Sequence, residues 1–290
     1  MTVSTWQLPK KQSPFTKSDL LDCTEVPSHQ KIPFILCGYR PAPQSKLSLL
    51  QTMFTLHNET GNMWTHLVGA VYFSAVGLQF YQQIWGGEQR AWTPEQAWLL
   101  LLIIATDFCL VCSVSYHLCK CGQQHTYECT LRMDMSGIVA LVAVSYFAGV
   151  ALAFRCFPSL RAAYLLYSGG VAVGISIPLV KPQLIPDVTR HFIGCVALGL
   201  IPAIHWISLS DPADLAVAVP YLVAMFACYG IGAFFYIQKW PERRWPGRFD
   251  FIGHSHQLWH IFVLLAAFSW VQGGFAMLEK FGADHCPKIE

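Results

Sequence analysis

Three histidines have the residue type and the spacing of a metal site. His117 ends one long apolar run of the sequence, and His256 and His260 open another run about 140 residues later. Residues four apart lie on one face of an α-helix, so His256 and His260 can point at one ligand together. Three imidazoles that converge on one point would form a zinc site with a fourth position left for water.

The composition indicates the environment in which these histidines lie. The 290 residues are 54% hydrophobic and only 12% charged, whereas soluble domains carry about 25% charged residues. The mean hydropathy of +0.40 agrees, and these values together predict an integral membrane protein. The net charge of +2, without a basic stripe, argues against a nucleic-acid partner. Most of the 11 cysteines are expected to be small buried apolar residues.

Seven stretches of the sequence are long and apolar enough to be membrane helices, which need about 20 mostly apolar residues. They are 65–84, 97–117, 135–155, 162–180, 191–209, 215–237 and 256–277. The fold class predicted is therefore an all-α membrane protein, a seven-transmembrane helix bundle. We divide the chain into an N-terminal segment, 1–64, a transmembrane zinc-binding domain, 65–278, and a tail, 279–290.

The distribution of Lys and Arg predicts how this bundle is oriented, because cytosolic loops of membrane proteins carry an excess of positive residues. If the N-terminus lies in the cytosol, the cytosolic segments hold 14 Lys and Arg residues and the external segments hold five. The sequence therefore predicts a cytosolic N-terminus and an external C-terminus. Alternation of the seven stretches then puts the three histidines, and Asp134 at the start of the third stretch, on the cytosolic side. Glu59 and Asn62, just before the first stretch, lie on that side too.

Each histidine also has a structural interpretation. A single histidine at a helix end, such as His117, can be an interfacial residue or a C-terminal cap favoured by the helix dipole. His256 and His260 could face the lipid headgroups, although His260 lies a full turn inside an apolar helix, where an unpaired polar group costs free energy. His254 is offset from that helical face, and we expect it to be more exposed and not a ligand.

Three further polar residues allow two interpretations each. Asp134 is either a charge at a helix N-terminus or a carboxylate that acts as a general base beside the metal. Ser113, four residues before His117, is either a hydroxyl in helix packing or a partner for a water or a histidine nitrogen. Asp107 lies in the middle of its stretch and is either a helix-packing hydrogen bonder or part of a polar channel.

A second group of possible metal ligands lies in one connection of the sequence. It consists of Cys119, Cys121, His125 and Cys129. Cysteine and histidine ligands of this kind bind structural zinc, but the paired CxxC spacing usual in such sites is missing. This group is the alternative to the three histidines.

Several blocks of the sequence resemble the progestin and adipoQ receptor family, which includes the adiponectin receptors. These blocks are GYRP (38–41), HNETGNMWTH (57–66), SVSYH (113–117), DMSG (134–137), PERRWPGRFD (241–250) and HSHQLWH (254–260). The resemblance extends over about residues 36–275. It implies seven transmembrane helices, a cytosolic N-terminus and a zinc ion in the inner leaflet.

The resemblance also implies roles for individual residues. By position, His117, His256 and His260 would bind the zinc, Asp134 would hold a water, and Ser113 would lie nearby. It further implies signalling in response to a hormone, steroid or lipid, and some members of the family are linked to ceramide hydrolysis.

Two functional hypotheses follow from the residues and the resemblance. In the first, the protein hydrolyses the amide of a ceramide-like lipid with the help of zinc and couples this reaction to signalling. In the second, it is a non-enzymatic receptor or scaffold with a purely structural zinc. Both hypotheses place it in a bilayer, in the plasma membrane, the Golgi or the endoplasmic reticulum. Both give it a lipid or steroid-like ligand, or the ceramide-like substrate, together with possible signalling proteins as partners.

Overall fold

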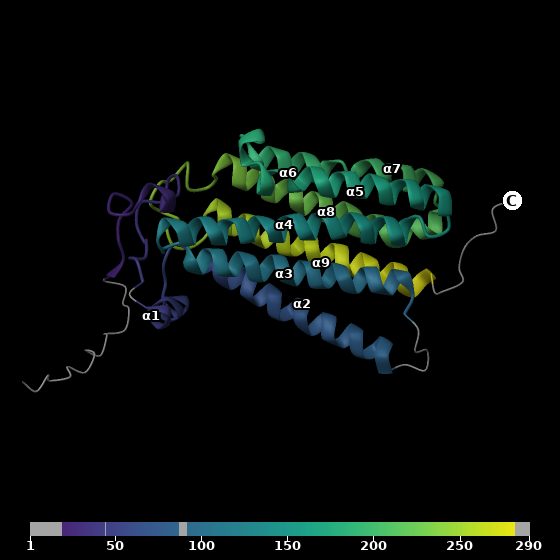
Figure 1. Cartoon of the computed structure of the whole chain (residues 1–290), viewed down its shortest axis with the longest axis horizontal. Helices are drawn as coiled ribbons and strands as arrows, with labels where there is room; N and C mark the ends of the chain where they lie inside the picture. The colour runs from purple at the N-terminus through teal and green to yellow at the C-terminus, as the bar shows by residue number, and fades with distance from the viewer. Residues whose placement is uncertain (1–18, 44, 87–91, 282–290) are drawn as a thin grey trace, which may run out of the picture.

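Long helices that run along one axis make up most of the molecule (Figure 1). The computed structural model describes residues 19–43, 45–86 and 92–281. The long helices are α2 (Thr60–Gly86), α3 (Pro94–Cys119), α4 (Gln124–Ala153), α5 (Pro158–Val180), α8 (Pro212–Gln238) and α9 (Ser255–Phe281). Shorter helices are η2 (Ser28–Gln30), α1 (Lys46–Gln51), η3 (Thr52–Phe54), η4 (Pro182–Leu184), α6 (Val188–Ala197) and α7 (Leu200–Leu209).

Six helical segments of the described residues are long and apolar enough to cross a membrane. They are α3, α4, α5, α6 together with α7, α8, and α9. The all-α membrane fold is therefore confirmed. α2 is equally long but is not among these six segments, and its last turns carry Gln79, Gln82 and Gln83. The count of seven spans stays a prediction.

The predicted fifth span, 191–209, is not one continuous helix, because α6 ends at Ala197 and α7 begins at Leu200. Pro202 has no backbone N–H and cannot donate to the carbonyl of Leu198, four residues earlier. The Leu198 carbonyl instead accepts from the N–H of Ile201 at 3.1 Å and from the Tyr167 hydroxyl of α5 at 3.0 Å. A neighbouring helix thus supplies one of the two donors at this break.

A second tyrosine satisfies the other carbonyl at this break. The N–H of Gly199 donates to Val196 O at 3.1 Å, in the tighter i to i+3 pattern of a 3₁₀ turn. The Cys195 carbonyl therefore lacks its α-helical donor, and the Tyr146 hydroxyl of α4 donates to it at 2.5 Å. A Cβ added at Gly199 would lie 3.3 Å from the Tyr146 oxygen, which is tighter than most contacts.

The helix that contains the third predicted span, 135–155, begins earlier than the span. α4 begins at Gln124, so Asp134 lies within the helix and not at its beginning. The residues that precede 135 include His125, Glu128 and Arg132, which are exposed in the structure. Polar residues of this kind resemble a loop in a search for apolar stretches, although a helix can continue beyond the apolar layer with its polar side chains in water.

The main apolar core joins α2, α3, α4 and α9, the helices that carry the candidate site. Its buried side chains include Phe73, Leu99, Leu110, Leu141 and Val271. At Gly137 of α4 an added Cβ would lie only 2.8 Å from the Cα of Cys109. α3 and α4 therefore approach each other closely just beyond Asp134.

The N-terminal segment packs on one end of the bundle, at the left of Figure 1. The Arg40 guanidinium donates to the His117 carbonyl at 2.6 Å and to the Thr52 hydroxyl at 2.7 Å, and so closes the end of α3. Leu21 and Tyr39 form an isolated antiparallel bridge within the segment. Part of the N-terminal segment, 1–64, is thus folded against the helices. Residues 1–18 and most of the tail, 282–290, lie outside the described residues.

The expectation that most cysteines are buried is wrong for the described residues. Cys109, Cys112, Cys121 and Cys195 are buried free thiols, whereas the other five free cysteines are partly or fully exposed. Cys156, in the connection between α4 and α5, is disulfide-bonded. This connection lies at the end of the bundle opposite to the N-terminal segment (Figure 1).

Candidate metal centre

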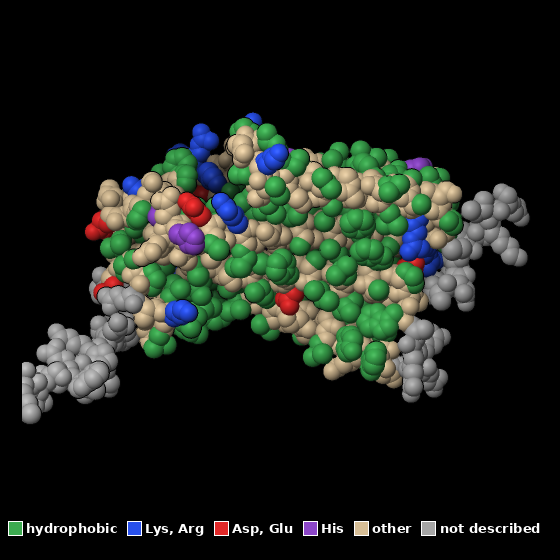
Figure 2. Space-filling view, in the orientation of Figure 1, with side chains coloured by type: hydrophobic (Ala, Val, Ile, Leu, Met, Phe, Trp, Pro, Cys, Tyr) green, Lys and Arg blue, Asp and Glu red, His purple; other side chains and the backbone are tan. Residues whose placement is uncertain are grey.

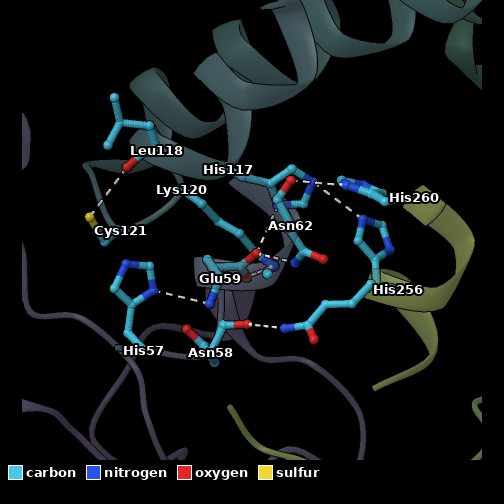
Figure 3. A network of polar contacts seen from close by, with 12 residues as sticks. His57, Asn58, Glu59, Asn62, His117, Leu118, Lys120, Cys121, His256 and His260 are labelled. Atoms are coloured by element: carbon cyan, nitrogen blue, oxygen red, sulfur yellow. Dashed lines mark hydrogen bonds and ion pairs between the residues drawn. The ribbon is translucent and has the colours of Figure 1, made fainter. Parts of the chain in front are cut away.

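The three histidines singled out in the sequence come together between α3 and α9. One ligand nitrogen from each of His117, His256 and His260 lies within 4.8 Å of the others, so the group could hold a metal ion. The Nε2 atoms of His117 and His256 are 3.3 Å apart. Figure 3 shows His256 and His260 of α9 facing His117 at the end of α3. Within the described part of the chain, no other group of three His, Cys, Asp or Glu side chains is this close.

A buried carboxylate orients the first of these rings. His117 is fully buried, and its Nδ1–H donates to Glu59 Oε2 at 2.7 Å. Its Nε2 is then an unprotonated acceptor that faces His256, as metal binding requires. Glu59 also accepts from Lys120 Nζ and from Asn62 Nδ2, each at 2.6 Å. Burial alone would raise the pKa of Glu59, but Lys120 and His117 hold it well below its usual range.

α2 orients the second ring. The Nδ1–H of His260 donates to the Asn62 carbonyl at 3.1 Å, which leaves Nε2 for a ligand. His66 stacks on the other side, with ring centroids 3.7 Å apart and an interplanar angle of 8°. His66 is buried, and neither of its ring nitrogens has a hydrogen-bond partner. It supports the plane of the His260 ring without being one of the three grouped histidines.

His254 corrects an expectation from the sequence, because it is completely buried rather than exposed. Its Nε2–H donates to the Asn58 carbonyl at 3.0 Å, which ties the start of α9 to the segment before α2. It is not one of the three grouped histidines. It holds two of the site's elements together instead.

Asp134 lies on α4, and Ser113 lies on α3, four residues before His117. Ser113 is buried and lies near the Asp134 carboxyl group. Neither residue belongs to the histidine group itself. Because α4 begins ten residues before Asp134, the interpretation of Asp134 as a charge at a helix N-terminus is wrong, and its role as a general base stays a prediction.

Asp107 lies on α3 about 15 Å from His117, at 1.5 Å per residue. Its Oδ2 accepts from the Ser74 hydroxyl of α2 at 2.5 Å. This contact supports the interpretation of Asp107 as a helix-packing hydrogen bonder.

The alternative metal cluster in the α3–α4 connection is not formed. Cys119, Cys121 and Cys129 are free thiols, and these residues and His125, all of them described, do not form a group of possible ligands. Burial raises the pKa of the Cys121 thiol, which disfavours the thiolate that binds metals. The histidines are therefore the better candidates.

The donor set of the histidine group fits zinc. Three imidazole nitrogens are the protein ligands of one common type of zinc site with an open position. Hydrogen bonds from Nδ1 fix the tautomers of His117 and His260, as in many metal sites. The lone pairs of two Nε2 atoms at 3.3 Å would repel each other unless a cation or a proton lay between them.

Sequence reasoning noted the polar character of Glu59 and Asn62 but gave them no role. Glu59 lies 58 positions before His117 in the sequence. Lys120 and His66 were not identified at all. A charged residue beside an apolar run was the only local signal, and it does not reveal which partner the residue contacts.

Fold and site together define a membrane protein with a buried histidine group at one end of a helical bundle. Comparison with known proteins identifies its family. A sequence model described as haemolysin-III related matches residues 54–271. The chain belongs to this family and, within it, to the progestin and adipoQ receptors.

Relatives from animals and plants are similar over most of the chain. Progestin and adipoQ receptor family member 3 of Mus musculus is 27% identical over 264 residues, which cover 88% of this chain and 84% of the relative. Heptahelical transmembrane protein 1 of Arabidopsis thaliana is 28% identical over 280 residues, 93% of this chain and 84% of the relative. The adiponectin receptor protein of Drosophila melanogaster is 30% identical over 251 residues, which cover 83% of this chain and 55% of the relative.

Proposed function

We propose that this receptor-family protein binds zinc through His117, His256 and His260 and hydrolyses the amide bond of a ceramide-like lipid, coupled to signalling. One observation carries the proposal: three histidine nitrogens converge, and two of the rings are oriented by buried hydrogen bonds. Oriented imidazoles of this kind are a feature of zinc sites.

The other residues of the site would handle protons. Zinc, when bound, polarises a carbonyl group and lowers the pKa of water. Asp134 would accept the proton of the attacking water and return it to the nitrogen of the leaving amine. Ser113, which lies near the Asp134 carboxyl group, would hold this group in place by a hydrogen bond.

An apolar cavity supports a lipid as the substrate. It has a volume of about 110 Å³ and lies between α4, α7, α8 and α9. On α4 its lining begins at Val142, about 12 Å along the helix from Asp134. Further lining residues are Phe154, Trp206, Met225 and Trp270. Such a lining suits an acyl chain whose polar end lies toward Asp134.

We place the histidine group on the cytosolic side of the membrane. The excess of Lys and Arg supports this orientation. The disulfide of Cys156 at the opposite end is a second argument, since disulfides persist in oxidising compartments. The free thiols of Cys119 and Cys121 lie at the histidine end. The plasma membrane, the Golgi and the endoplasmic reticulum all fit, and 65–278 remains our proposal for the membrane domain.

The test combines metal analysis with a lipid assay on purified protein. We expect wild type to contain zinc and to release fatty acid from ceramides. His256→Ala and His260→Ala should lose most of the zinc, whereas Cys119→Ser/Cys121→Ser should keep it. Asp134→Ala should keep much of the zinc but lose hydrolysis, since such groups contribute about 10²–10⁴-fold to rates.

Equal hydrolysis by wild type and Asp134→Ala would indicate a contaminating enzyme and refute the catalytic proposal. The non-enzymatic receptor or scaffold is the second candidate. It is supported by the origin of the three histidines on α3 and α9, which a bound metal would tie together, and it predicts zinc without turnover in wild type.

A further inference from the structure

The connection between α8 and α9, residues 239–254, exposes three arginines. We call it the arginine loop. Arg243, Arg244 and Arg248 are all exposed, and none of them forms an ion pair with another described residue. Figure 2 shows Lys and Arg side chains gathered at this end of the molecule. The loop therefore presents a positive surface that the described part of the protein does not neutralise.

The two acidic residues of the loop point inward and anchor it. Glu242 is buried and accepts from both the N–H and the hydroxyl of Ser255, at the start of α9. Asp250 is buried and accepts from the N–H groups of Leu36 and Cys37, at 3.1 and 2.8 Å. Both carboxylates therefore form hydrogen bonds inside the protein and no ion pairs with the described arginines of the loop. Both ends of the exposed stretch are also held in place, which reduces the entropy lost on binding.

Aromatic side chains place the loop at the boundary between membrane and water. Trp240 and Trp245 are 44% and 41% exposed, and tryptophan is enriched at the level of lipid headgroups. The Arg244 guanidinium lies 5.8 Å from the centre of the Trp245 ring. The loop directly connects two helices apolar enough to span the membrane. Its arginines therefore lie near the phosphates of the adjacent leaflet.

We propose that the arginine loop is a binding surface for anionic phospholipid headgroups of the leaflet next to the histidine group. Guanidinium groups bind phosphate through two parallel hydrogen bonds and stay charged when partly desolvated. Each basic residue near an anionic membrane surface contributes about 1 kcal/mol to binding. Three such residues together strengthen binding on the order of 100-fold, which corresponds to about 3 kcal/mol.

Binding at this surface would also affect the histidine group. Glu242 directly precedes Arg243, and its partner Ser255 directly precedes His256. A bound headgroup that holds the loop therefore also holds the start of α9. This helix carries two of the three histidines, His256 and His260. The lipid composition of the leaflet would thus influence the site through one buried carboxylate.

The test measures lipid binding to the full chain in detergent. Short-chain phosphatidylinositol phosphate, phosphatidylserine and phosphatidylcholine are titrated, and bound lipid is counted by native mass spectrometry. We expect the two anionic lipids to bind and phosphatidylcholine not to bind. Arg243→Gln/Arg244→Gln/Arg248→Gln should weaken anionic-lipid binding on the order of 100-fold. The single change Arg244→Gln should weaken anionic-lipid binding about fivefold. This single variant replaces the triple variant in the test if the triple variant does not fold.

The matched control removes the same number of positive charges at the same end of the bundle. All three replaced residues are exposed: Arg132 lies on α4, Lys181 in the connection after α5, and Arg190 on α6, where it pairs with Asp187. Arg132→Gln/Lys181→Gln/Arg190→Gln should bind anionic lipid as wild type does. An equal loss in this control would show diffuse charge attraction and overturn the proposal. Equal binding of phosphatidylcholine by wild type, or unchanged binding by the loop variants, would overturn it too.

Discussion

At the scale of single residues, the orientation of His117 depends on the Glu59 carboxylate. Glu59→Gln removes the charge that faces Lys120 and weakens the acceptor for the His117 Nδ1–H. Loss of such a partner typically lowers metal affinity about 10–100-fold. We expect the zinc affinity of Glu59→Gln to fall by this factor, and competition with a chelator measures it. Glu95→Gln, which breaks the ion pair with Arg161, is the control and should leave zinc affinity unchanged. Unchanged affinity in Glu59→Gln would show that the carboxylate does not act on the metal site.

His57 predicts a pH dependence of stability. Burial is the main cause that lowers its pKa from 6.5 to about 3, and its neutral ring accepts from Glu59 N–H and donates to the Thr52 carbonyl. The folded state thus binds fewer protons than the unfolded state, and stability is lost as the pH falls below 6.5. At pH 5 the loss is about 2 kcal/mol. Thermal unfolding of His57→Gln at pH 7.5 and 5 should show a smaller decrease than wild type, and an equal decrease would contradict this role.

At the scale of elements, the break between α6 and α7 depends on hydroxyl groups from neighbouring helices. Tyr146→Phe removes the donor to the Cys195 carbonyl, and a buried acceptor left without a partner costs about 1–3 kcal/mol. We expect a lower unfolding temperature in detergent. Tyr72→Phe changes an exposed tyrosine and should have almost no effect. Equal unfolding temperatures for Tyr146→Phe and wild type would mean that water satisfies this carbonyl.

At the scale of the whole molecule, orientation and span number are linked. An odd number of spans puts the two termini on opposite sides of the membrane. Epitope tags at each end, detected before and after selective permeabilisation of the plasma membrane, should show a cytosolic N-terminus and an external C-terminus. Tags on the same side would mean that α2 does not cross the membrane, and that the sequence count of seven is wrong.

The sequence by itself determined the properties that depend on neighbours within a few turns. Runs of apolar residues predicted the long helices, and the spacing of His256 and His260 predicted one shared helical face. Apolar runs also indicated a membrane environment, because a run of about 20 mostly apolar residues is long enough to span the hydrocarbon core of a bilayer as a helix. Alternation of the spans predicted that His117 lies on the same side of the membrane as His256 and His260. The structure confirms that the three histidines converge.

Only the tertiary structure decided which distant residues meet. The contact between Glu59 and His117, the stacking of His66 on His260 and the burial of His254 join segments far apart in the chain. The break at Gly199 likewise depends on tyrosines of other helices. Helical periodicity repeats every 3.6 residues and specifies a face, but not the neighbour that packs against it. That neighbour is selected by the packing of the whole bundle, in which close contacts at Gly137 and elsewhere set the helix positions.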